Sequence, residues 1–575
     1  MKPNKKSGQF VYNCIPILIL AACSIGLFIR SFYSFSWSDE SFYLTLAHRF
    51  WLGERMIADE WNPAQLSTLL LLPFYSLYQW VTGGNEGVYL YFRLLYLGLS
   101  MFAAFFTYFK LKKRNLRIAS LICTLIYFLY SRVNIGGMSY YNVTLSCTLL
   151  ASVLLYDWIC DKKGKMKLFI SGILLAFAVI NTPFLAFPYL AIVIYLLIKK
   201  KYRLFWHEIL VVAAGTAIVA IFCIGYILYK VPINELLLNI PYILNDPARQ
   251  QTNPVLAIPI ILVRIAWRFK WTIWISGFLT IYILLRKRKG IIFSQKEISL
   301  LTGINLPIFI FNSYLAKDLL GCINIAGILF AVPVICAFNN WKNIDKNILG
   351  VFGTAGVSLI LGFSFSSNTG LDALTIGFVV LAMGAVLLIF QLGELKREQI
   401  LLGTVLVVFS IMIFQTGILR FFSVYRDAPI NQLNTQITSG PAKYLYTTEE
   451  HVRQYDELRA AINQYVRDDD KVFYSKSCFW SYLCSNNEYG VPSSWRMDFD
   501  SPRLQEYYEL NPEKIPTCIF VLNPAYGNFE SSLIQNNEKV PYPNENNVEG
   551  YLYDYIKQHD YEKIELECAV IYRSQ

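Results

Sequence analysis

Long runs of apolar residues recur along most of this sequence and restrict its possible folds more than any other feature. Residues 16–29, PILILAACSIGLFI, form the first run. A helix satisfies its backbone hydrogen bonds within one segment, so such runs are expected to cross a lipid bilayer as helices. Charged residues make up 16% of the chain, against roughly 25% in a typical soluble domain. We therefore expect a polytopic α-helical membrane protein.

The apolar runs within residues 1–422 predict about 13 transmembrane helices, since each crossing needs about 20 residues. The expected helices lie near residues 11–31, 87–109, 117–131, 141–160, 168–183, 184–198, 206–229, 271–286, 298–315, 319–338, 347–363, 371–391 and 400–421. The first one follows a basic N-terminus. No small-residue cleavage site comes after it, so we interpret it as an uncleaved helix.

Basic residues gather in the short loops between these segments. KLKKRNLR at 110–117 and RKRKG at 286–290 are two examples. Because lysine and arginine stay on the cytoplasmic side, we expect a cytoplasmic N-terminus in the plasma membrane and a C-terminus outside. Residues 64–81 and 254–268 are then interfacial helices, since a span at 64–81 would place 110–117 outside. The net charge of +11 therefore reflects membrane topology and indicates no nucleic-acid partner.

After residue 422 the composition becomes polar. About 150 residues can bury a core, so residues 423–575 are expected to form an extracytoplasmic α/β domain. Its expected elements are a helix at 448–466, strands at 470–476 and 517–523, a helix at 551–559, and a strand or hairpin at 563–573. Cys478 and Cys484 are compatible with a disulfide and equally with two free thiols.

The first outer loop, residues 32–86, carries two acidic pairs: Asp39 with Glu40, and Asp59 with Glu60. Ser38 can cap a helix whose first turn holds the first pair, and apolar residues then recur at helical spacing. We expect this helix to lie on the membrane surface. Acids in a first turn also have a simple explanation, because they stabilise the helix dipole by a few tenths to about 1 kcal/mol.

Potential cations separate the two acidic pairs. They are His48, Arg49 and Arg55. A site that activates a hydroxyl group beside a lipid phosphate needs a carboxylate to accept the hydroxyl proton and cations to hold the phosphate. The loop is therefore a candidate site for group transfer from a phosphorylated lipid. As a lone histidine, His48 is more commonly a surface or packing residue than a ligand.

Several segments resemble one known superfamily. SDESFYLTLAHRFWLGE at 38–54 and ADEWNP at 58–63 are similar to the first outer loop of GT-C glycosyltransferases. That superfamily includes the protein O-mannosyltransferases and the aminoarabinose transferase of lipid A. YFRLLYLGLSMFAAFF at 91–106 resembles the family's second span, and GGMSYYNVTLSCTLLASVLL at 136–155 resembles a later one. The resemblance extends over nearly the whole chain in short motifs and implies the GT-C fold.

The resemblance also implies a reaction. In this family a monosaccharide passes from a polyprenyl-phosphate donor to an acceptor outside the membrane, such as a cell-wall polymer, polysaccharide, lipid or protein. The general base falls on Asp39, with Glu40 beside it, and the second acid of the loop falls on Asp59 or Glu60. Phosphate leaves as a stable anion, so one base suffices, and attack from the opposite side inverts the anomeric carbon. The family has a turn of the Lys-Pro type, whereas this chain has Asn-Thr-Pro at 181–183.

Further candidates lie near the outer membrane boundary. Cations there can hold a donor phosphate or act as interfacial anchors; together with Arg55 they are Arg93, Arg132, Arg249 and Lys317. Candidates for a sugar or acceptor pocket are His48, Tyr140, Tyr141 and Asn142, although boundary tyrosines commonly form an aromatic belt. The sequence requires no cofactor. A divalent metal could bind Asp39, Asp59 and Glu60, but their spacing does not demand one.

Three other functions stay open at this point. A transporter or flippase of lipid-linked sugars places ionisable groups inside spans and commonly has repeated halves, whereas these acids cluster in an outer loop and no repeat is found. A polysaccharide polymerase or ligase shares lipid-linked substrates but would use a pyrophosphate-linked oligosaccharide. A receptor or scaffold that binds through the C-terminal domain leaves the acidic loop unexplained.

Overall fold

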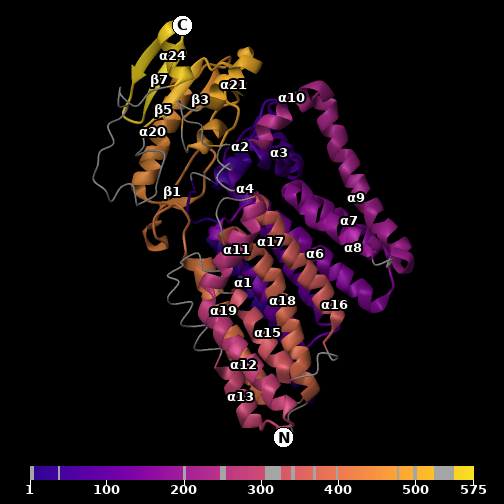
Figure 1. The fold of residues 1–575 in the computed structure, drawn as a ribbon. Helices are drawn as coiled ribbons and strands as arrows, with labels where there is room; N and C mark the ends of the chain where they lie inside the picture. Colours follow the sequence, from indigo (N-terminus) through magenta and orange to yellow (C-terminus); the bar gives the residue numbers. More distant parts are fainter. Residues whose placement is uncertain are drawn as a thin grey trace.

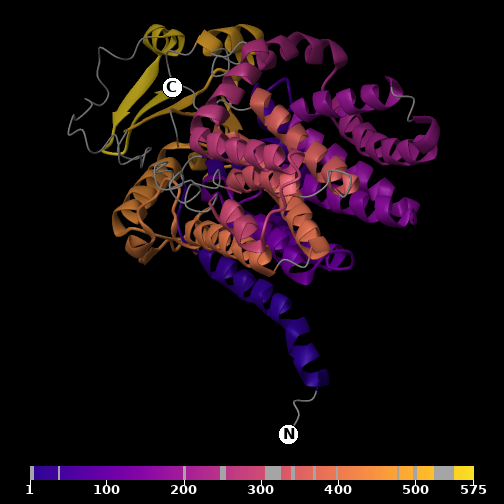
Figure 2. The same ribbon diagram turned by 60° about the horizontal axis from the view of Figure 1, so that its bottom comes forward.

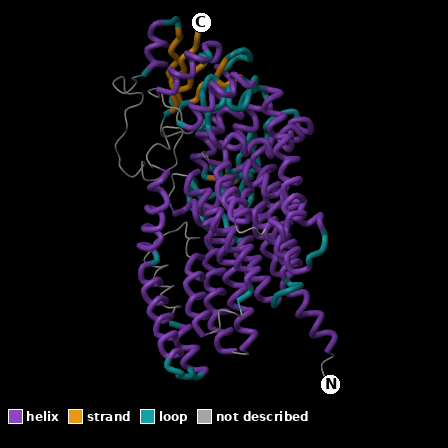
Figure 3. The backbone as a smooth tube through the Cα atoms, turned by 45° about the vertical axis from the view of Figure 1, so that its right-hand side comes forward, coloured by secondary structure: helices purple, strands orange, loops and turns teal. Residues whose placement is uncertain are grey.

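The computed structural model of the protein describes residues 5–36, 39–198, 202–245, 254–304, 325–338, 344–366, 371–396, 399–475, 478–495, 502–523 and 550–575. The described chain is mostly helical. Its helices form a long bundle, and a mixed α/β region from the C-terminal part of the chain lies at one end of that bundle (Figures 1 and 3).

Six described helices are long and apolar enough to cross a membrane, as expected of a multi-pass membrane protein. They are Val88–Leu111, Tyr140–Asp161, Trp206–Lys230, Lys346–Ser366, Ala373–Gln391 and Gly403–Phe422. Shorter apolar helices are Cys14–Arg30, Arg117–Phe128, Pro183–Ile198, Ile233–Leu244 and Gly327–Phe338. Apart from Ile233–Leu244, these helices coincide with segments predicted to span the membrane.

The helices of the bundle and its connections follow one another along the chain. They are α1 (Lys5–Arg30), α4 (Val88–Leu111), α5 (Arg117–Phe128), α6 (Tyr140–Asp161), α7 (Lys165–Asn181), α8 (Ala186–Ile198), α9 (Tyr202–Lys230), α10 (Ile233–Leu244), α11 (Pro254–Arg268), α12 (Lys270–Arg288), α13 (Gln295–Gly303), α15 (Gly327–Phe338), α16 (Lys346–Ile348), α17 (Thr354–Ser366), α18 (Leu371–Lys396) and α19 (Gln399–Phe422). Short helical turns are η2 (Arg132–Asn134), η3 (Pro183–Leu185) and the π-helical η7 (Leu349–Gly353). Figure 2 shows the N-terminal part of α1 extending away from the other helices.

Two uniformly apolar helices have opposite surroundings. The apolar stretch of α18 is almost entirely buried among its neighbours, whereas α9 exposes large side chains such as Ile221, Phe222 and Tyr229. An exposed apolar surface of this kind suits contact with lipid. At the crossing of α7 and α9, Gly172 and Gly215 each lie directly against the backbone of the other helix. Small residues permit this close approach.

The first loop folds into α2 (Asp39–Trp51), the turn η1 (Pro63–Ser67) and α3 (Thr68–Thr82). The predicted helix is confirmed, and Gly53 follows it with φ +103°. Ser38, its predicted cap, lies outside the described residues. All residues from 40 to 50 are buried, because α3 and the turn η9 (Phe479–Leu483) both pack against α2. The prediction that this helix lies on the membrane surface is therefore wrong, since the C-terminal region covers it.

In its described residues, the C-terminal region contains a five-stranded sheet and three α-helices. The sheet order is β4 (Glu488–Tyr489), β3 (Lys471–Tyr474), β5 (Cys518–Leu522), β7 (Ala569–Ser574) and β6 (Tyr561–Glu565). β3 runs parallel to β4 and β5, whereas β7 is antiparallel to β5 and β6. The helices are α20 (Glu449–Tyr465), α21 (Pro502–Leu510) and α24 (Tyr551–Gln558). The predicted helices and strands are confirmed, and the segment at 563–573 is a hairpin.

Backbone hydrogen bonds join the C-terminal region to the first loop. The antiparallel pair β1 (Thr435–Gln436) and β2 (Tyr446–Thr447) lies beside the end of α1, where Ser34 N donates to the Tyr446 carbonyl at 2.9 Å. Trp61 N donates to the Pro492 carbonyl at 2.6 Å. The short turns η8 (Ile430–Gln432) and η10 (Pro512–Lys514) complete this region. The part of the first loop that carries the acidic pairs thus lies between the bundle and the C-terminal region.

Candidate functional site

Glu60 anchors the first loop to the C-terminal region. Its side chain is fully buried. Oε2 accepts hydrogen bonds from Arg49 Nη1 at 2.7 Å and from the backbone N and Oγ of Ser494, each at 3.1 Å. Oε1 accepts from the backbone N of Asn62 at 2.9 Å. This carboxylate is therefore occupied by structural contacts and is closed to a substrate.

Asp59 also has a structural role. Its Oδ2 accepts from the backbone N of Arg55 at 2.6 Å, and its Oδ1 pairs with Arg55 Nη2 at 2.9 Å. Lys514 Nζ lies 3.9 Å from Oδ2. Burial by itself raises the pKa of Asp59, but the charge of Lys514 and the hydrogen bonds of Arg55 outweigh it, so this pKa lies below its ordinary value. Arg55, a predicted phosphate ligand, also pairs with Glu235 of α10 at 2.6 Å.

Arg49 is the cation at the centre of this interface. Its side chain is fully buried, and its Nε pairs with Glu54 Oε2 at 2.7 Å. Nη2 donates to the carbonyls of Asp59 and Val491 at 2.5 and 2.8 Å. Burial raises the pKa of Glu54 although Arg49 and Lys514 oppose that shift. The cluster is a buried ion-pair network between α2 and the C-terminal region.

Glu40 forms a bidentate pair with Arg93 of α4. The two contacts measure 2.6 and 2.7 Å, and the two residues are 5% and 4% exposed. Arg93 also donates to the carbonyls of Ser31 and Ser34, each at 2.9 Å. These contacts tie α4 to the end of α1 and to the start of α2. Arg93, predicted to hold a donor phosphate, is committed to them instead.

His48 is a packing residue. It is fully buried, and its Nδ1 lies 2.9 Å from Tyr489 Oη while its Nε2 lies 3.3 Å from Asn486 Oδ1. Burial lowers the pKa of His48 to about 4, despite hydrogen bonds that favour the protonated ring. His48 is therefore neutral at physiological pH and does not line a sugar pocket.

Asp39 differs from the other three members of the two acidic pairs because 20% of its side chain stays exposed. Tyr425 Oη donates a 2.5 Å hydrogen bond to Oδ2, and Arg426 Nη1 lies 3.7 Å from the same atom. Burial and the charge of Asp39 raise the pKa of Tyr425 above its ordinary value. Arg426 adopts φ +52°, a conformation unusual for a residue with a side chain. Arg132 adds a second positive charge, with its guanidinium 3.8 Å from the centroid of the Tyr141 ring.

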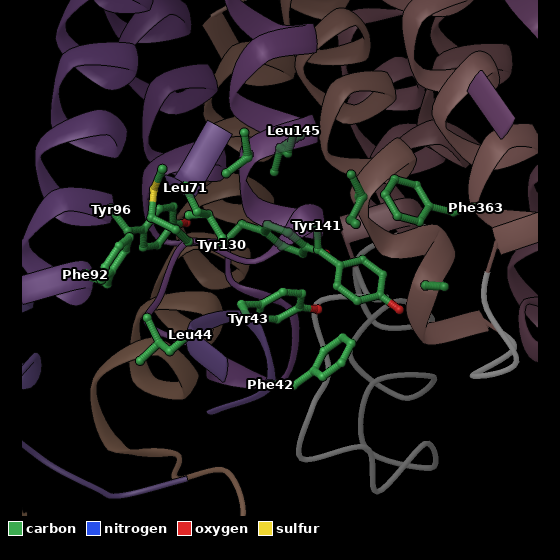
Figure 4. Packing of buried hydrophobic residues seen from close by; sticks show 14 of the residues in the cluster. Phe42, Tyr43, Leu44, Leu71, Phe92, Tyr96, Tyr130, Tyr141, Leu145 and Phe363 are labelled. Carbon is green, nitrogen blue, oxygen red and sulfur yellow. The ribbon is translucent and has the colours of Figure 1, made fainter. Parts of the chain in front are cut away.

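Aromatic rings form the wall next to Asp39. The rings of Tyr43, in α2, and Tyr140, at the start of α6, have centroids 5.8 Å apart. Tyr141 stacks on Phe363 of α17 at 5.2 Å, and Figure 4 shows Tyr43 and Tyr141 near each other with Phe363 beyond them. Asn142 is buried and donates to two backbone carbonyls of the preceding loop. It therefore holds that loop against the start of α6, where Tyr140 and Tyr141 lie. Aromatic faces with two cations and a carboxylate suit a sugar phosphate.

Two predicted sets of ligands remain, one for a phosphate and one for a metal ion. Arg249 and Lys317 lie outside the described residues. In the part of the chain that the structure describes, no three histidine, cysteine or acidic side chains are placed to hold a metal ion. Asp59 and Glu60 face the C-terminal region and Asp39 faces the tyrosines, so the suggested metal ligands do not converge. The described cysteines are free thiols, and these include Cys478 and Cys484.

Sequence reasoning does not single out Tyr425 and Arg426. Tyr425 is 386 positions from Asp39 along the chain, and its surroundings resemble an ordinary linker after the last apolar helix. No protein-family model matches this chain, and no curated protein matches it in sequence. Fold and site together define a multi-pass membrane protein with a carboxylate-centred polar site at the end of its helical bundle.

Proposed function

We propose that this protein is an integral membrane glycosyltransferase that moves a monosaccharide from a polyprenyl-phosphate donor to an extracytoplasmic acceptor. One observation carries the proposal. Among the four carboxylates of the two acidic pairs, Asp39 retains exposure beside two arginines and a wall of tyrosines, whereas Glu40, Asp59 and Glu60 are committed to buried ion pairs. A carboxylate next to cations is the pairing that base-assisted transfer from a phosphate requires.

In the proposed reaction Asp39 is the general base. It takes the proton of an acceptor hydroxyl group while the hydroxyl oxygen forms a bond to the anomeric carbon. The bond from that carbon to the phosphate oxygen breaks, and the phosphate leaves with the electron pair. Arg132 and Arg426 stabilise the negative charge of the departing phosphate, and the hydrogen bond from Tyr425 orients Asp39. Attack opposite the leaving group inverts the anomeric carbon.

The membrane arrangement is part of the proposal. About 13 spans, a cytoplasmic N-terminus and an extracytoplasmic C-terminal domain at 423–575 would place Asp39 at the outer face of the plasma membrane. The donor would reach it from the outer leaflet through its lipid tail. The acceptor, a cell-wall polymer, polysaccharide, lipid or protein, would arrive from outside. The GT-C fold suggested by the first-loop motifs agrees with this arrangement.

The test is transfer of radiolabelled sugar from polyprenyl-phosphate donors by the purified full-length protein. We expect Asp39→Asn to lower turnover by about 10²–10⁴-fold, the usual contribution of a general base. Donor binding and the thermal unfolding midpoint should stay unchanged, because the side-chain amide of the variant still offers an oxygen to accept the Tyr425 hydrogen bond. Glu450→Gln is the matched control, since Glu450 lies on the exposed surface of α20.

Turnover of Asp39→Asn within threefold of wild type would contradict the proposed base. Absence of turnover by the wild type with each donor and candidate acceptor would favour the transporter or polymerase alternatives. A pyrophosphate-linked oligosaccharide should be included as a donor, because its use would identify a polymerase or ligase.

A further inference from the structure

Helix α10 has an exposed apolar face. Four large side chains form it, each between 52% and 72% exposed: Ile233, Leu237, Leu238 and Leu244. Their positions fall on one side of a helix with 3.6 residues per turn. An exposed apolar surface of this kind marks contact with another molecule or with a membrane. These four side chains are called the apolar face of α10 below.

The opposite side of α10 is docked on the first loop. Asn239 is buried, and its Oδ1 accepts a hydrogen bond from Trp61 Nε1 at 2.8 Å. The ring of Tyr242 stacks on Trp61, and the two ring centroids are 4.4 Å apart. Glu235 pairs with Arg55 at 2.6 Å. These contacts fix the rotation of α10 about its axis, so its apolar face points away from the first loop.

Charge and length limit what this face can contact. The sequence of the helix, INELLLNIPYIL, contains a single charged residue, Glu235, which pairs with Arg55. The apolar face therefore offers no ion pair to a charged partner. The 12 residues of the helix rise about 18 Å, whereas the hydrocarbon core of a bilayer is about 30 Å thick. Because α10 is too short to cross a membrane, it would contact one by lying along the surface.

Helix α9, which is long and apolar enough to cross a membrane, leads directly into α10. It ends at Lys230, and α10 begins at Ile233. Phe222 and Tyr229 of α9 are 74% and 84% exposed, so the exposed apolar surface continues from one helix to the next. Figure 1 shows α10 beyond the end of α9, at the end of the bundle where the C-terminal region lies. The end of a membrane-crossing helix lies at the boundary of the bilayer, and α10 follows it there.

We infer that α10 is an interfacial helix whose apolar face binds the surface of the phospholipid bilayer. Helices of this kind bury their apolar side about 5–10 Å deep, at the boundary between headgroups and acyl chains. Continuity with the exposed surface of α9 favours lipid over a second copy of the chain or a soluble protein. The bilayer then holds the helix on which Trp61 is docked, and with it the segment that carries Asp59 and Glu60. The inference does not rest on the proposed transfer reaction.

Contact with lipid can be measured by photo-crosslinking. The full-length protein with the substitution Leu238→p-benzoylphenylalanine is reconstituted in nanodiscs of phosphatidylcholine and phosphatidylglycerol, irradiated, and analysed by mass spectrometry for covalent lipid adducts. The same substitution at Phe222 of α9 gives the yield for a side chain among acyl chains, and at Arg453, exposed on α20, it gives the background. We expect the lipid adduct at Leu238 to exceed that background at least about tenfold, since acyl chains would surround the benzophenone group.

The crosslinked products distinguish the occupants of the face. Lipid adducts at Leu238 support the inference. A yield no greater than that at Arg453 overturns it, and so does a crosslinked dimer or a crosslink within the chain in place of the lipid adduct. Thermal unfolding of each variant establishes that the protein is folded before irradiation. If the variant at Leu238 does not fold, the same substitution at Leu237, on the same face, decides the question. The transfer assay with Asp39→Asn is independent of all these outcomes.

Discussion

Removing the cation at the centre of the loop interface should loosen the C-terminal region. The change is Arg49→Met, which keeps much of the side-chain volume and deletes the charge. It leaves the carboxylates of Glu54 and Glu60 without their shared partner, and both are buried. Two backbone carbonyls, of Asp59 and Val491, lose a donor as well.

The size of the effect follows from these contacts. Breaking a buried ion pair by deleting one partner costs about 3–5 kcal/mol. Glu54 keeps Lys514 at 3.3 Å, so the loss is partly compensated and a value of about 4 kcal/mol is reasonable for the whole substitution. For a unit of about 150 residues each kcal/mol shifts the unfolding midpoint by about 2–4 °C, which predicts a decrease of about 10 °C.

The assay is thermal unfolding of the purified protein in detergent, followed by intrinsic tryptophan fluorescence. Trp61 and Trp480 are fully buried in or near this interface and should report its opening. Arg453→Met is the control, because Arg453 makes exposed pairs that contribute about 0–1 kcal/mol. The double variant Arg49→Met with Glu60→Gln should be less unstable than the two single losses combined, since it also removes an unpaired charge.

A midpoint for Arg49→Met within 2 °C of wild type would refute this reasoning. It would mean that the network contributes no more than an exposed pair does. Additivity of the double variant would show that Arg49 and Glu60 do not interact energetically, whatever their distance. Either result would also reopen a catalytic role for Glu60.

Two further predictions concern a buried ring and a helix crossing. Folding keeps His48 neutral down to about pH 4, while the unfolded chain protonates it below about pH 6.5, so stability should fall as pH decreases between these values. In the variant His48→Asn, up to about 3 kcal/mol of this pH-dependent loss of stability should be absent. Its unfolding midpoint should therefore decrease less between pH 7.5 and 4.5 than the midpoint of the wild type does. Equal decreases in the two proteins would contradict the prediction. Gly172→Leu should destabilise the bundle by several kcal/mol, because its Cβ would overlap the Val212 carbonyl of α9. Gly277→Leu, where a Cβ meets open space, should change the midpoint little, and similar effects of the two substitutions would argue against the crossing.

Much of the fold can be predicted from local patterns. Ten of the apolar helices coincide with predicted spans, and the start of α2 at Asp39 follows from acids in a first turn followed by helical spacing. The strands at 471–474 and 518–522 were marked by short β-branched and aromatic runs. These features depend on residues a few positions apart, and hydrophobic periodicity is a pattern over that same distance.

Local patterns fail at the candidate site for the same reason. The apolar spacing of α2 is equally compatible with a membrane surface and with a protein interface, and the structure buries it beneath η9. The four carboxylates of the two acidic pairs look alike in sequence. Their surroundings in the folded protein differ because their partners, Arg93, Lys514 and Tyr425, come from distant parts of the chain.

The sequence by itself determined that this chain forms apolar helices, a polar C-terminal α/β region and an acidic first loop, because hydrophobicity and helix or strand spacing act over short distances. Only the tertiary structure decided which carboxylates are paired and which one stays accessible. Pairing of a buried charge depends on where a partner such as Arg49 or Arg93 lies in space, and the desolvation that makes the pair necessary exists only once the chain has packed.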